Sequence, residues 1–348
     1  MWLVTARDLQ FRARRFIIAI AVTSLVFGIA LAIDGMRRSV QHEIPAIVAN
    51  FDADQWVTAR GASGPFTTTR VIDAATADAV SDSPGVHEAD AVVLSRTVSG
   101  SGDPADANLV GHVVGGLGAP PISEGHAART SGEAVVSPGI TVDVGDDLQV
   151  GGETFRVVGK TAGGRYYFGI PTVFVPLEDA QDIVFHGQDL AMGVAVKGHL
   201  DTPPPDMRVL DNSQVESDLR RPLAGGVQSL VVTAVLMWLI AAGIIGLIVY
   251  LSALERLRDF AVFKATGAPT RIIVGGLMLQ SVIVSVLAAA LAIPVSKLVG
   301  FGLPFPSKLG VQGLVQMLAI AVVVGLLASL AGVRSALTTD PAAAFGGN

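Results

Sequence analysis

The stretch ERLRDFAVFKATGAPTR, residues 255–271, lies between two long runs of sequence that carry no charged residue. The run before it covers residues 222–254, and the run after it covers residues 272–296. A helix needs about 20 apolar residues to cross the hydrocarbon core of a membrane, so both runs are long enough. The stretch between them combines charges with two phenylalanines, Phe260 and Phe263. This pattern predicts a short amphipathic helix on one membrane face, pressed against a partner protein.

The composition supports a membrane protein with one water-exposed part. Hydrophobic residues make up 51% of the 348-residue chain and charged residues only 16%, and the mean hydropathy is +0.56. Residues 39–221 hold 25 acidic and 11 basic side chains, a net charge of −14, whereas the remainder holds 5 and 13, a net charge of +8. Cysteine is absent, which excludes disulfides, thiolate metal sites and a cysteine nucleophile. We therefore expect an acidic domain inserted into a basic, membrane-embedded frame.

Four apolar runs have the length of a membrane span, at residues 16–33, 230–251, 272–296 and 309–333. They predict an α-helical membrane protein with four transmembrane helices and one inserted extracytoplasmic α+β domain. The predicted layout is a cytosolic amino-terminal segment (1–15), a first span (16–34), an extracytoplasmic domain with helical stalk ends (35–221), a stalk and second span (222–254), a cytosolic coupling helix (255–271), a third span (272–296), an extracytoplasmic loop (297–308), a fourth span (309–333) and a cytosolic tail (334–348).

The first span has a second interpretation, as a cleaved signal peptide. Four arginines precede it, and Ala30-Leu31-Ala32 is similar to a signal-peptidase site. The apolar run is longer than the core of an ordinary signal peptide, and cleavage would leave three spans. A retained helix is therefore favoured.

The predicted stalk rests on apolar residues and helix signals next to the first two spans. Ser213 and Glu216 have the S-x-x-E spacing of a capping box, which predicts a helix that starts in water and runs into the membrane. After the first span, apolar residues continue along one helical face, although Pro45 would bend that helix. They are Met36, Val40, Ile44 and Ile47. The alternative is that Gly225-Gly226 breaks the second helix.

Lysine and arginine residues near the spans indicate the orientation. The amino terminus, the stretch 255–271 and the tail together hold nine of them, whereas the opposite side holds six. Positive residues concentrate on the cytoplasmic side of membrane proteins. This modest excess favours placing both termini and the stretch 255–271 in the cytosol.

The inserted domain is predicted to combine short strands with two helices. Predicted strands cover residues 55–59, 91–98, 109–114, 154–158, 172–175 and 191–196. The helices are expected at 73–81, with Asp73 as cap, and at 177–185, after Pro176. Residues 99–106 and 115–121 are rich in Gly, Ser, Pro or Asp and are predicted to be flexible loops.

Several patterns that would indicate chemistry are incomplete. Gly159-Lys160-Thr161 lacks the upstream glycine of a phosphate loop, since Thr154 occupies that position. The six histidines are scattered, and Asp143, Asp146 and Asp147 are better explained as a solvated turn than as a calcium site. The predicted spans have no interior ionisable residue, which disfavours ion-coupled transport. Small-residue pairs predict close helix contacts, at Ala242/Gly246, Ser281/Ser285 and Ala328/Gly332.

At the stretch 255–271 the sequence resembles the FtsX-like permease family, the MacB-type subunits of ABC transporters. The family pattern is close to E-R-x-R-[DE]-[FIL]-[AG]-x-[FL]-K-A-x-G-A, and it is matched by Glu255, Arg256, Arg258, Asp259, Phe260, Ala261, Phe263, Lys264, Ala265, Gly267 and Ala268. The tail from Arg334 to Phe345 resembles the family's closing motif, and residues 133–161 resemble its periplasmic core domain. The order of one span, a large domain and three spans also matches. The resemblance is weakest between residues 52 and 132.

The resemblance implies a non-catalytic permease subunit that binds no cofactor itself. Two permease copies, identical or related, would each dock on one of two cytosolic ABC ATPase copies, which carry ATP and Mg²⁺. The docking residues carried over are Glu255, Arg256, Arg258, Asp259, Phe260, Phe263, Lys264, Gly267 and Ala268. ATP hydrolysis would move these helices and, through the stalks, the outer domain, a process called mechanotransmission. No nucleic-acid partner is expected.

The resemblance leaves two functions open for a multi-pass protein of the bacterial plasma membrane. The first is export or extraction of a lipid, lipoprotein, peptide or drug. The second is a signal-transmitting scaffold whose outer domain is bound to a cell-wall hydrolase as an extracytoplasmic partner. The division-type scaffolds have smaller outer domains, so the inserted domain of this chain favours transport. Amino-acid import is disfavoured because importer permeases lack such a domain.

Overall fold

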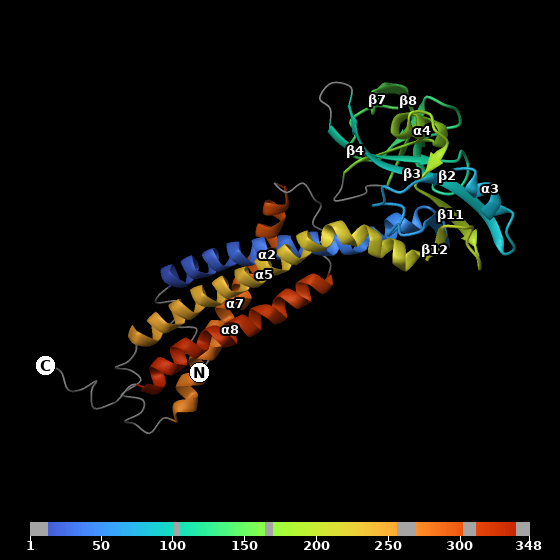
Figure 1. Ribbon diagram of the computed structural model, residues 1–348. Coiled ribbons are helices and arrows are strands. Elements are labelled where there is room, and N and C mark those ends of the chain that lie inside the picture. Colours follow the sequence, from blue (N-terminus) through green and yellow to red (C-terminus); the bar gives the residue numbers. More distant parts are fainter. Residues whose placement is uncertain (1–12, 101–104, 164–169, 256–268, 302–310, 339–348) are drawn as a thin grey trace. The chain divides into compact units, whose positions relative to one another are not determined.

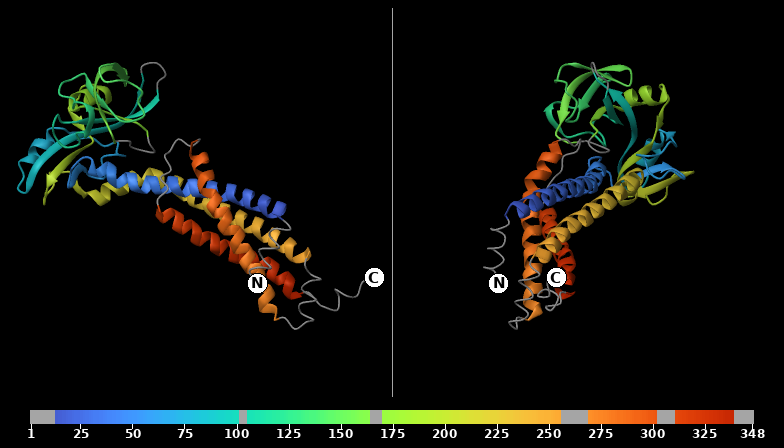
Figure 2. Two further views of the ribbon diagram at one scale, coloured as in Figure 1. Left: turned by 180° about the vertical axis from the view of Figure 1, so that it is seen from behind. Right: turned by 90° about the vertical axis from the view of Figure 1, so that its left-hand side faces the viewer.

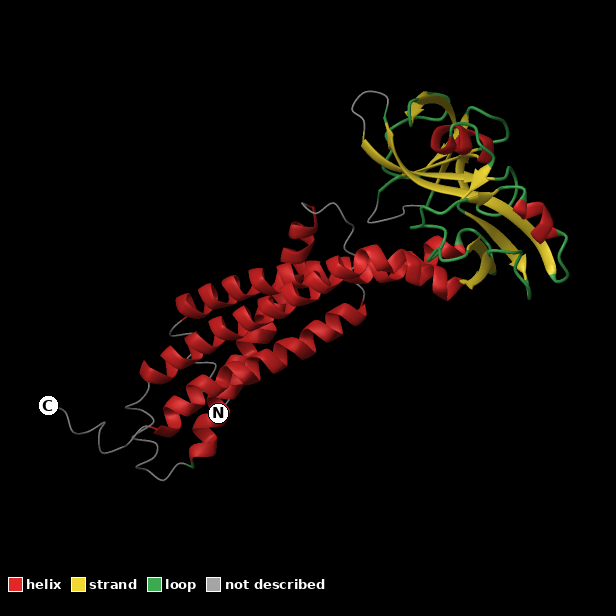
Figure 3. Cartoon of the chain, in the orientation of Figure 1, coloured by secondary structure: helices red, strands yellow, loops and turns green. Residues whose placement is uncertain are grey.

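The computed structural model describes residues 13–100, 105–163, 170–255, 269–301 and 311–338. The chain divides into two compact units. One unit comprises Met1–Ser39 and Gly226–Asn348 and is helical, and the other comprises Val40–Gly225 and is rich in strands (Figure 3). They are called the helical unit and the β-rich unit below.

Four long helices contribute to the helical unit (Figure 1). They are α2 (Ala13–Ala49), α5 (Asn212–Glu255), α7 (Thr270–Phe301) and α8 (Val311–Thr338). Among residues whose side chains are described, α2, α5 and α7 contain runs long and apolar enough to cross a membrane, whereas α8 contributes only the shorter run Gly313–Ser329. The structure therefore gives three candidate spans, and the predicted fourth span at 309–333 stays a prediction.

The helical unit buries many alanines beside some larger side chains, and it exposes many large apolar side chains. Figure 2 shows its four helices from two further sides. The buried cluster draws residues from all four of them and is rich in alanine, for example Ala241, Ala288 and Ala321. Large aliphatic side chains point away from it, and Leu239 and Val315 are 62% and 63% exposed. In water such an exterior would be unfavourable, whereas in lipid it costs nothing. This distribution is that of a membrane-embedded bundle.

The long helices continue through residues that often interrupt helices. Pro45 lies inside α2, Pro222 inside α5 and Pro294 inside α7. The alternative that Gly225-Gly226 ends the second helix is wrong, because α5 is continuous across both glycines. Helix α2 likewise continues past Pro45 to Ala49, and Ile44 and Ile47 on either side of this proline are buried. The stalk itself stays a prediction.

The β-rich unit is built on a mixed ten-stranded sheet. Its strands are β1 (Gln55–Ala59), β3 (Val86–Ser99), β4 (Ala105–His112), β5 (Ile122–Gly125), β6 (Glu133–Val136), β7 (Asp147–Val150), β8 (Glu153–Thr161), β9 (Thr172–Pro176), β11 (Gly193–Gly198) and β12 (Met207–Asp211). The order is β12-β1-β11-β3-β4-β9-β6-β8-β5, with β7 pairing to β3 and β8. Pairs β4–β9 and β6–β8 are parallel. A separate ladder joins β2 (Ile72–Asp73) to β10 (Leu190–Ala191).

One strand, β3, takes part in two hydrophobic cores. Its first half pairs with β11 and contributes Ala91 to a core that also contains Val57 of β1 and α3 (Thr76–Ser81). Its second half pairs with β4 and contributes Val93 to a core with Leu109 and α4 (Leu177–Phe185). In Figure 1, β7, β8 and α4 gather at one end of the unit, and β11, β12 and α3 gather at the other. The unit thus has two lobes that share β3.

Most predicted elements of the inserted domain are present, with shifted ends. The predicted strand 55–59 and helix 177–185 coincide with β1 and α4. The predicted strand 191–196 is divided between β10 and β11, and the predicted loop 99–106 ends earlier because β4 begins at Ala105. Residues 101–104 of that loop lie outside the described residues. The strands β2, β5, β6, β7 and β12 were not among the predicted ones.

Both predicted helix caps of the inserted domain are wrong. Helix α3 begins at Thr76, and Asp73 instead belongs to β2, where its Oδ1 accepts a hydrogen bond from the Ala75 amide at 3.0 Å. This contact makes a local turn that delays the helix. At the start of α5, the predicted pair Ser213–Glu216 does not form the cap, because Asp211 and Gln214 do, as described below.

Candidate functional site

The predicted docking segment follows directly after α5. Glu255 is the last residue of α5 and is exposed, and α7 begins at Thr270. The other predicted docking residues lie outside the described residues: Arg256, Arg258, Asp259, Phe260, Phe263, Lys264, Gly267 and Ala268. Their role stays a prediction, and the structure describes the helices to which the segment is attached.

A buried polar contact joins α5 and α7 near that segment. Gln280 Nε2 donates a hydrogen bond to Ser252 Oγ at 3.4 Å, and both side chains are buried. Ala253 and Leu277 lie in the surrounding apolar cluster. A polar group in such a cluster is stable only with a partner, so the contact favours one register of the two helices.

The contact between α7 and α8 is tight because both helices present small residues. Ser281 Oγ donates to the carbonyl oxygen of Gly325 at 2.6 Å. A Cβ atom at Gly325 would lie 2.8 Å from Ser285 Oγ and 3.0 Å from Val282 Cα, closer than real Cβ atoms approach. The predicted pair Ser281/Ser285 therefore lies at a close helix contact. Gly246 and Ala328, from the other two predicted pairs, also face each other, across α5 and α8. The surroundings of Gly332 lie outside what the structure describes.

In the β-rich unit, three aromatic rings lie where α2 ends and α5 begins. Phe51, just after α2, lies 5.1 Å from Trp56 and 5.7 Å from Phe66 between ring centroids. Trp56 is fully buried, and its Nε1 donates to Asn212 Oδ1 at 2.9 Å. Asn212 is the first residue of α5, and its Nδ2 donates to the Ala53 carbonyl at 2.8 Å. The beginning of α5 is thus bonded to the segment that follows α2.

A second attachment on α5 is the buried carboxylate of Asp218. Its Oδ2 accepts hydrogen bonds from the amides of Phe66 and Thr67, each at 3.2 Å, and the Thr67 hydroxyl donates to Oδ1. Asp218 is 1% exposed, so these donors replace its hydration. Gly64 packs so closely on this carboxylate that an added Cβ would lie 2.5 Å from Oδ2. The loop containing residues 64–67 is therefore fixed to α5.

The first turn of α5 is capped by Asp211 and Gln214. Asp211 Oδ1 accepts a hydrogen bond from the Gln214 amide at 2.9 Å, and Gln214 Oε1 accepts one from the Asp211 amide at 3.1 Å. This is the reciprocal geometry of a capping box, two residues before the predicted one. Hydrogen bonds from the Ser213 hydroxyl and the Gln214 amide lower the pKa of Asp211. Glu216 instead pairs with Arg220 at 3.0 Å.

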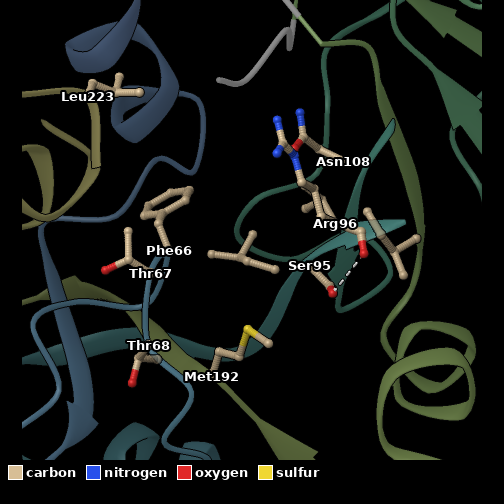
Figure 4. Close-up of a pocket in the computed structure, with 11 residues that line it drawn as sticks. Phe66, Thr67, Thr68, Ser95, Arg96, Asn108, Met192 and Leu223 are labelled. Atoms are coloured by element: carbon tan, nitrogen blue, oxygen red, sulfur yellow. Dashed lines mark hydrogen bonds between the residues drawn. The ribbon is translucent and has the colours of Figure 1, made fainter. Parts of the chain in front are cut away.

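A cavity of about 420 Å³ adjoins the loop that Asp218 holds (Figure 4). One side is formed by a face of strands β3 and β4, where Leu94 lies opposite Val110 and Arg96 lies opposite Asn108. The other walls come from the loop and from two further segments: Phe66, Thr67, Thr68, Met192 and Leu223. Leu223 belongs to α5, so this helix, the loop and the sheet meet at the cavity.

Comparisons with known proteins show the family of this chain. Residues 231–341 match the family model described as FtsX-like permease C-terminal. An uncharacterized ABC transporter permease of Mycobacterium tuberculosis is 38% identical over 348 residues, and the match covers 100% of both chains. The chain belongs to the FtsX-like ABC transporter permeases. A second uncharacterized ABC transporter permease of Mycobacterium tuberculosis is 34% identical to this permease, again over 100% of both chains.

Two solved structures are similar to part of this permease. One is the periplasmic region of MacB from Actinobacillus actinomycetemcomitans, with 10% identity and a TM-score of 0.37 over 49% of this chain and 94% of that one. The other is the extracellular domain of the noncanonic ABC-type transporter YknZ from Gram-positive bacteria, with 14% identity and a TM-score of 0.34 over 46% of this chain and 100% of that one.

The charged residues that were weighed as possible ligand groups in this permease form ion pairs at the surface. Lys160, at the end of β8, pairs with Asp143 at 3.0 Å, and this hydrogen bond raises the pKa of Lys160. Arg156 pairs with Asp147 at 3.2 Å. Within the described ranges, no group of three or more His, Asp or Glu side chains is placed to hold a metal ion. Asp143 and Asp147 are therefore paired with basic side chains at the surface.

Proposed function

We propose that this permease couples ATP hydrolysis by a separate cytosolic ATPase to movement of its β-rich unit, and that this movement exports or extracts a lipid, lipoprotein, peptide or drug. Membership of the FtsX-like ABC transporter permeases supports the pairing with an ATPase. The working complex would contain two ATPase copies and two permease copies in the bacterial plasma membrane, with both permease termini in the cytosol.

The observation that carries the proposal is the continuity of α5. This helix begins with the Asp211–Gln214 cap, holds the loop of Phe66 through Asp218, and continues without a break to Glu255, where the docking segment begins. The same helix is thus attached to β-rich structure at its start and to the predicted ATPase contact at its end.

The character of the helical unit favours mechanical transmission over an ion-coupled mechanism. Its contacts are made by small residues and hydroxyl groups, such as Ser281 with Gly325. The predicted spans lack the interior ionisable residues that proton- and sodium-coupled carriers use. The energy would then come from ATP hydrolysis by the ATPase, and the helices would transmit the resulting movement to the β-rich unit.

The test is to remove the two aromatic residues of the docking segment. Phe260→Ala combined with Phe263→Ala should abolish co-purification of the ATPase while leaving membrane insertion intact. Aromatic anchors at interfaces typically lose about 2 kcal/mol or more each when truncated. The measurement is the yield of ATPase recovered with tagged permease, compared with the amount of permease in the membrane fraction.

Lys264→Ala is the matched control, because it removes a charge from the same segment without removing an anchor. A charge at the rim of an interface contributes about 1 kcal/mol or less, so this variant should retain most of the ATPase. Wild-type ATPase yield with the double variant would overturn the docking assignment. In that case the phenylalanines would be lipid-facing residues of an interfacial helix.

A further inference from the structure

The cavity beside α5 has an apolar interior. Its walls include Phe66, Leu94 and Val110, and Met192 and Leu223 extend the apolar lining. Figure 4 shows Phe66 and Met192 bordering one space that Ser95 and Arg96 also border. Ligand cavities of proteins commonly measure about 300–1,000 Å³, are mostly apolar and carry a few polar groups that orient the ligand. At about 420 Å³, this cavity has the size of a site for a small molecule or a single chain.

The polar side chains of the cavity, apart from Arg96, already have protein partners. The Thr67 hydroxyl donates to Asp218, and the Ser95 hydroxyl donates to the Arg96 carbonyl at 3.3 Å. Asn108 Nδ2 donates to the Ile170 carbonyl at 3.3 Å. Thr68 Oγ1 accepts a hydrogen bond from the Arg70 amide at 2.9 Å. Arg96 is therefore the side chain best able to bind an incoming polar group.

Arg96 is exposed, and it is the one charged side chain among the described residues that line the cavity. It forms no ion pair with any residue in the described part of the chain. Asp106 follows on the same face of β4, but it lies opposite Val98 and not opposite Arg96. A guanidinium binds carboxylates and phosphates through two parallel hydrogen bonds, and these charge-assisted bonds are among the stronger ones in proteins. The charge of the site thus suits an anionic group at one end of an apolar ligand.

We propose that this cavity binds a single-chain anionic amphiphile, such as a fatty acid or a lysophosphatidate, with its chain between Phe66, Leu94 and Met192 and its acidic group on Arg96. Leu223 lies on α5, whose uncharged run extends to Leu254, so the same helix contacts the ligand and enters the membrane-spanning region. The inference rests on the proposed function for the ligand's role as cargo, whereas binding itself can be measured independently of ATPase docking.

The experiment uses full-length permease in phosphatidylcholine nanodiscs and a palmitic acid probe with a diazirine in its chain. After irradiation, mass spectrometry should locate labelled peptides containing residues 66–68, 94–96 or 108–110. Excess palmitate or lysophosphatidate should compete for this labelling, and a diazirine-bearing hexadecanol should label these peptides weakly. Labelling confined to the apolar helices, or equal labelling by the alcohol, would overturn the proposal. Competition by a carboxylate-ended apolar peptide but not by palmitate would assign the cavity to a protein partner instead.

Two variants test the proposed contacts one at a time. Arg96→Gln should reduce labelling of the cavity peptides about tenfold, because it removes a charge-assisted pair. Met192→Trp should reduce it by filling the apolar end, and normal hydrogen exchange of β3 and β11 would show that this variant folds. Arg156→Gln is the control, since Arg156 is an exposed arginine of the same unit paired with Asp147 away from the cavity.

Equal labelling of Arg96→Gln and Arg156→Gln would contradict the assigned contact. The ATPase yield is measured in the same preparations to separate the two proposals. Absence of cavity labelling in the wild-type permease, together with a normal ATPase yield, would reject the ligand site alone. Cavity labelling in a permease that recovers no ATPase would reject the proposed function alone.

Discussion

The buried side chains of the helical unit and of the β-rich unit differ in size and chemistry. The helical unit buries many alanines and serines beside some larger side chains such as Phe27 and Ile245, and large aliphatic side chains such as Leu239 face outward. The β-rich unit buries Trp56 and Phe51 at its helix junction and many valines in its cores. One unit therefore relies on close approach of backbones and the other on removal of large apolar surface from solvent.

This difference follows from the solvent around each unit. Lipid chains are as apolar as leucine, so helices in a membrane gain little by burying large side chains and gain more from close packing and interhelical hydrogen bonds. A domain in water is stabilised mainly by apolar surface buried on folding. The same kind of substitution should therefore have unequal effects in the two units.

The two described tryptophans offer the largest test of this comparison. Trp56→Ala should lower the stability of the β-rich unit by about 4 kcal/mol, because it leaves a cavity and an unpaired Asn212. Trp238→Ala should cost less, since Trp238 is only partly buried beside Phe27. Hydrogen exchange of β1 and α5 amides would measure both effects, with Trp56→Phe as an intermediate control. Equal losses in the two variants would refute the proposed contrast.

A second test adds a methyl group at the close contact between α7 and α8. Gly325→Ala should cost about 2 kcal/mol, because the added methyl meets Val282 Cα and the Ser281 carbonyl oxygen, which are backbone atoms. Gly243→Ala is the control on α5, since a Cβ there meets nothing within 4 Å. The midpoint of thermal unfolding in detergent should fall by several degrees for the first variant only. Unchanged midpoints in both would mean that the α7–α8 contact is looser than the structure has it.

The smallest predicted effect is a pH dependence confined to the β-rich unit. Burial lowers the pKa of His112 from its ordinary value of 6.5, although a hydrogen bond to the Val113 carbonyl and the charge of Asp90 oppose the shift. Below pH 6.5 the unfolded chain binds a proton that folded His112 does not, so stability falls as the pH falls, by at most about 1.4 kcal/mol per pH unit. Pulse proteolysis between pH 7.5 and 5.5 would measure the slope, and His112→Gln should reduce it. A slope unaffected by this substitution would place the titrating group elsewhere.

Sequence alone was sufficient where local pattern determines structure. The strand β1 and the helix α4 were predicted with correct ends. Helix α4 follows Pro176 and carries Glu178 and Asp179 in its first turn. The strands that were not predicted are mostly short, and β6 and β12 are stabilised by pairing with distant segments. The cap of α5 shows the same limit: two capping spacings overlap, and the end of β12 at Asp211 selects between them.

The contacts around α5 were harder to predict because their residues come from separate parts of the sequence. Trp56 and Phe66 bond to Asn212 and Asp218 of α5, which lie 156 and 152 residues further along the chain. One local signal was available for Asp218. It lies three residues after Val215 and one before Leu219, both buried, so it occupies the apolar face of its helix. A carboxylate at such a position requires hydrogen-bond donors from elsewhere in the fold.

The path of the chain between the two lobes of the β-rich unit has a consequence for how such permeases diversify. The chain leaves β3 for the lobe of α4 and returns to β11, and at the crossing Met192 donates its amide hydrogen to the Val92 carbonyl at 3.0 Å. Entry and exit of that lobe therefore lie on neighbouring strands, whereas the other lobe carries both connections to α2 and α5. The lobe of α4 is thus inserted between two neighbouring strands, and it bonds back to the other lobe where the Gly118 amide donates to the Phe51 carbonyl at 3.2 Å. Replacement of this lobe by recombination or design would therefore have to keep β3 whole and also keep the contact with Phe51, which follows α2.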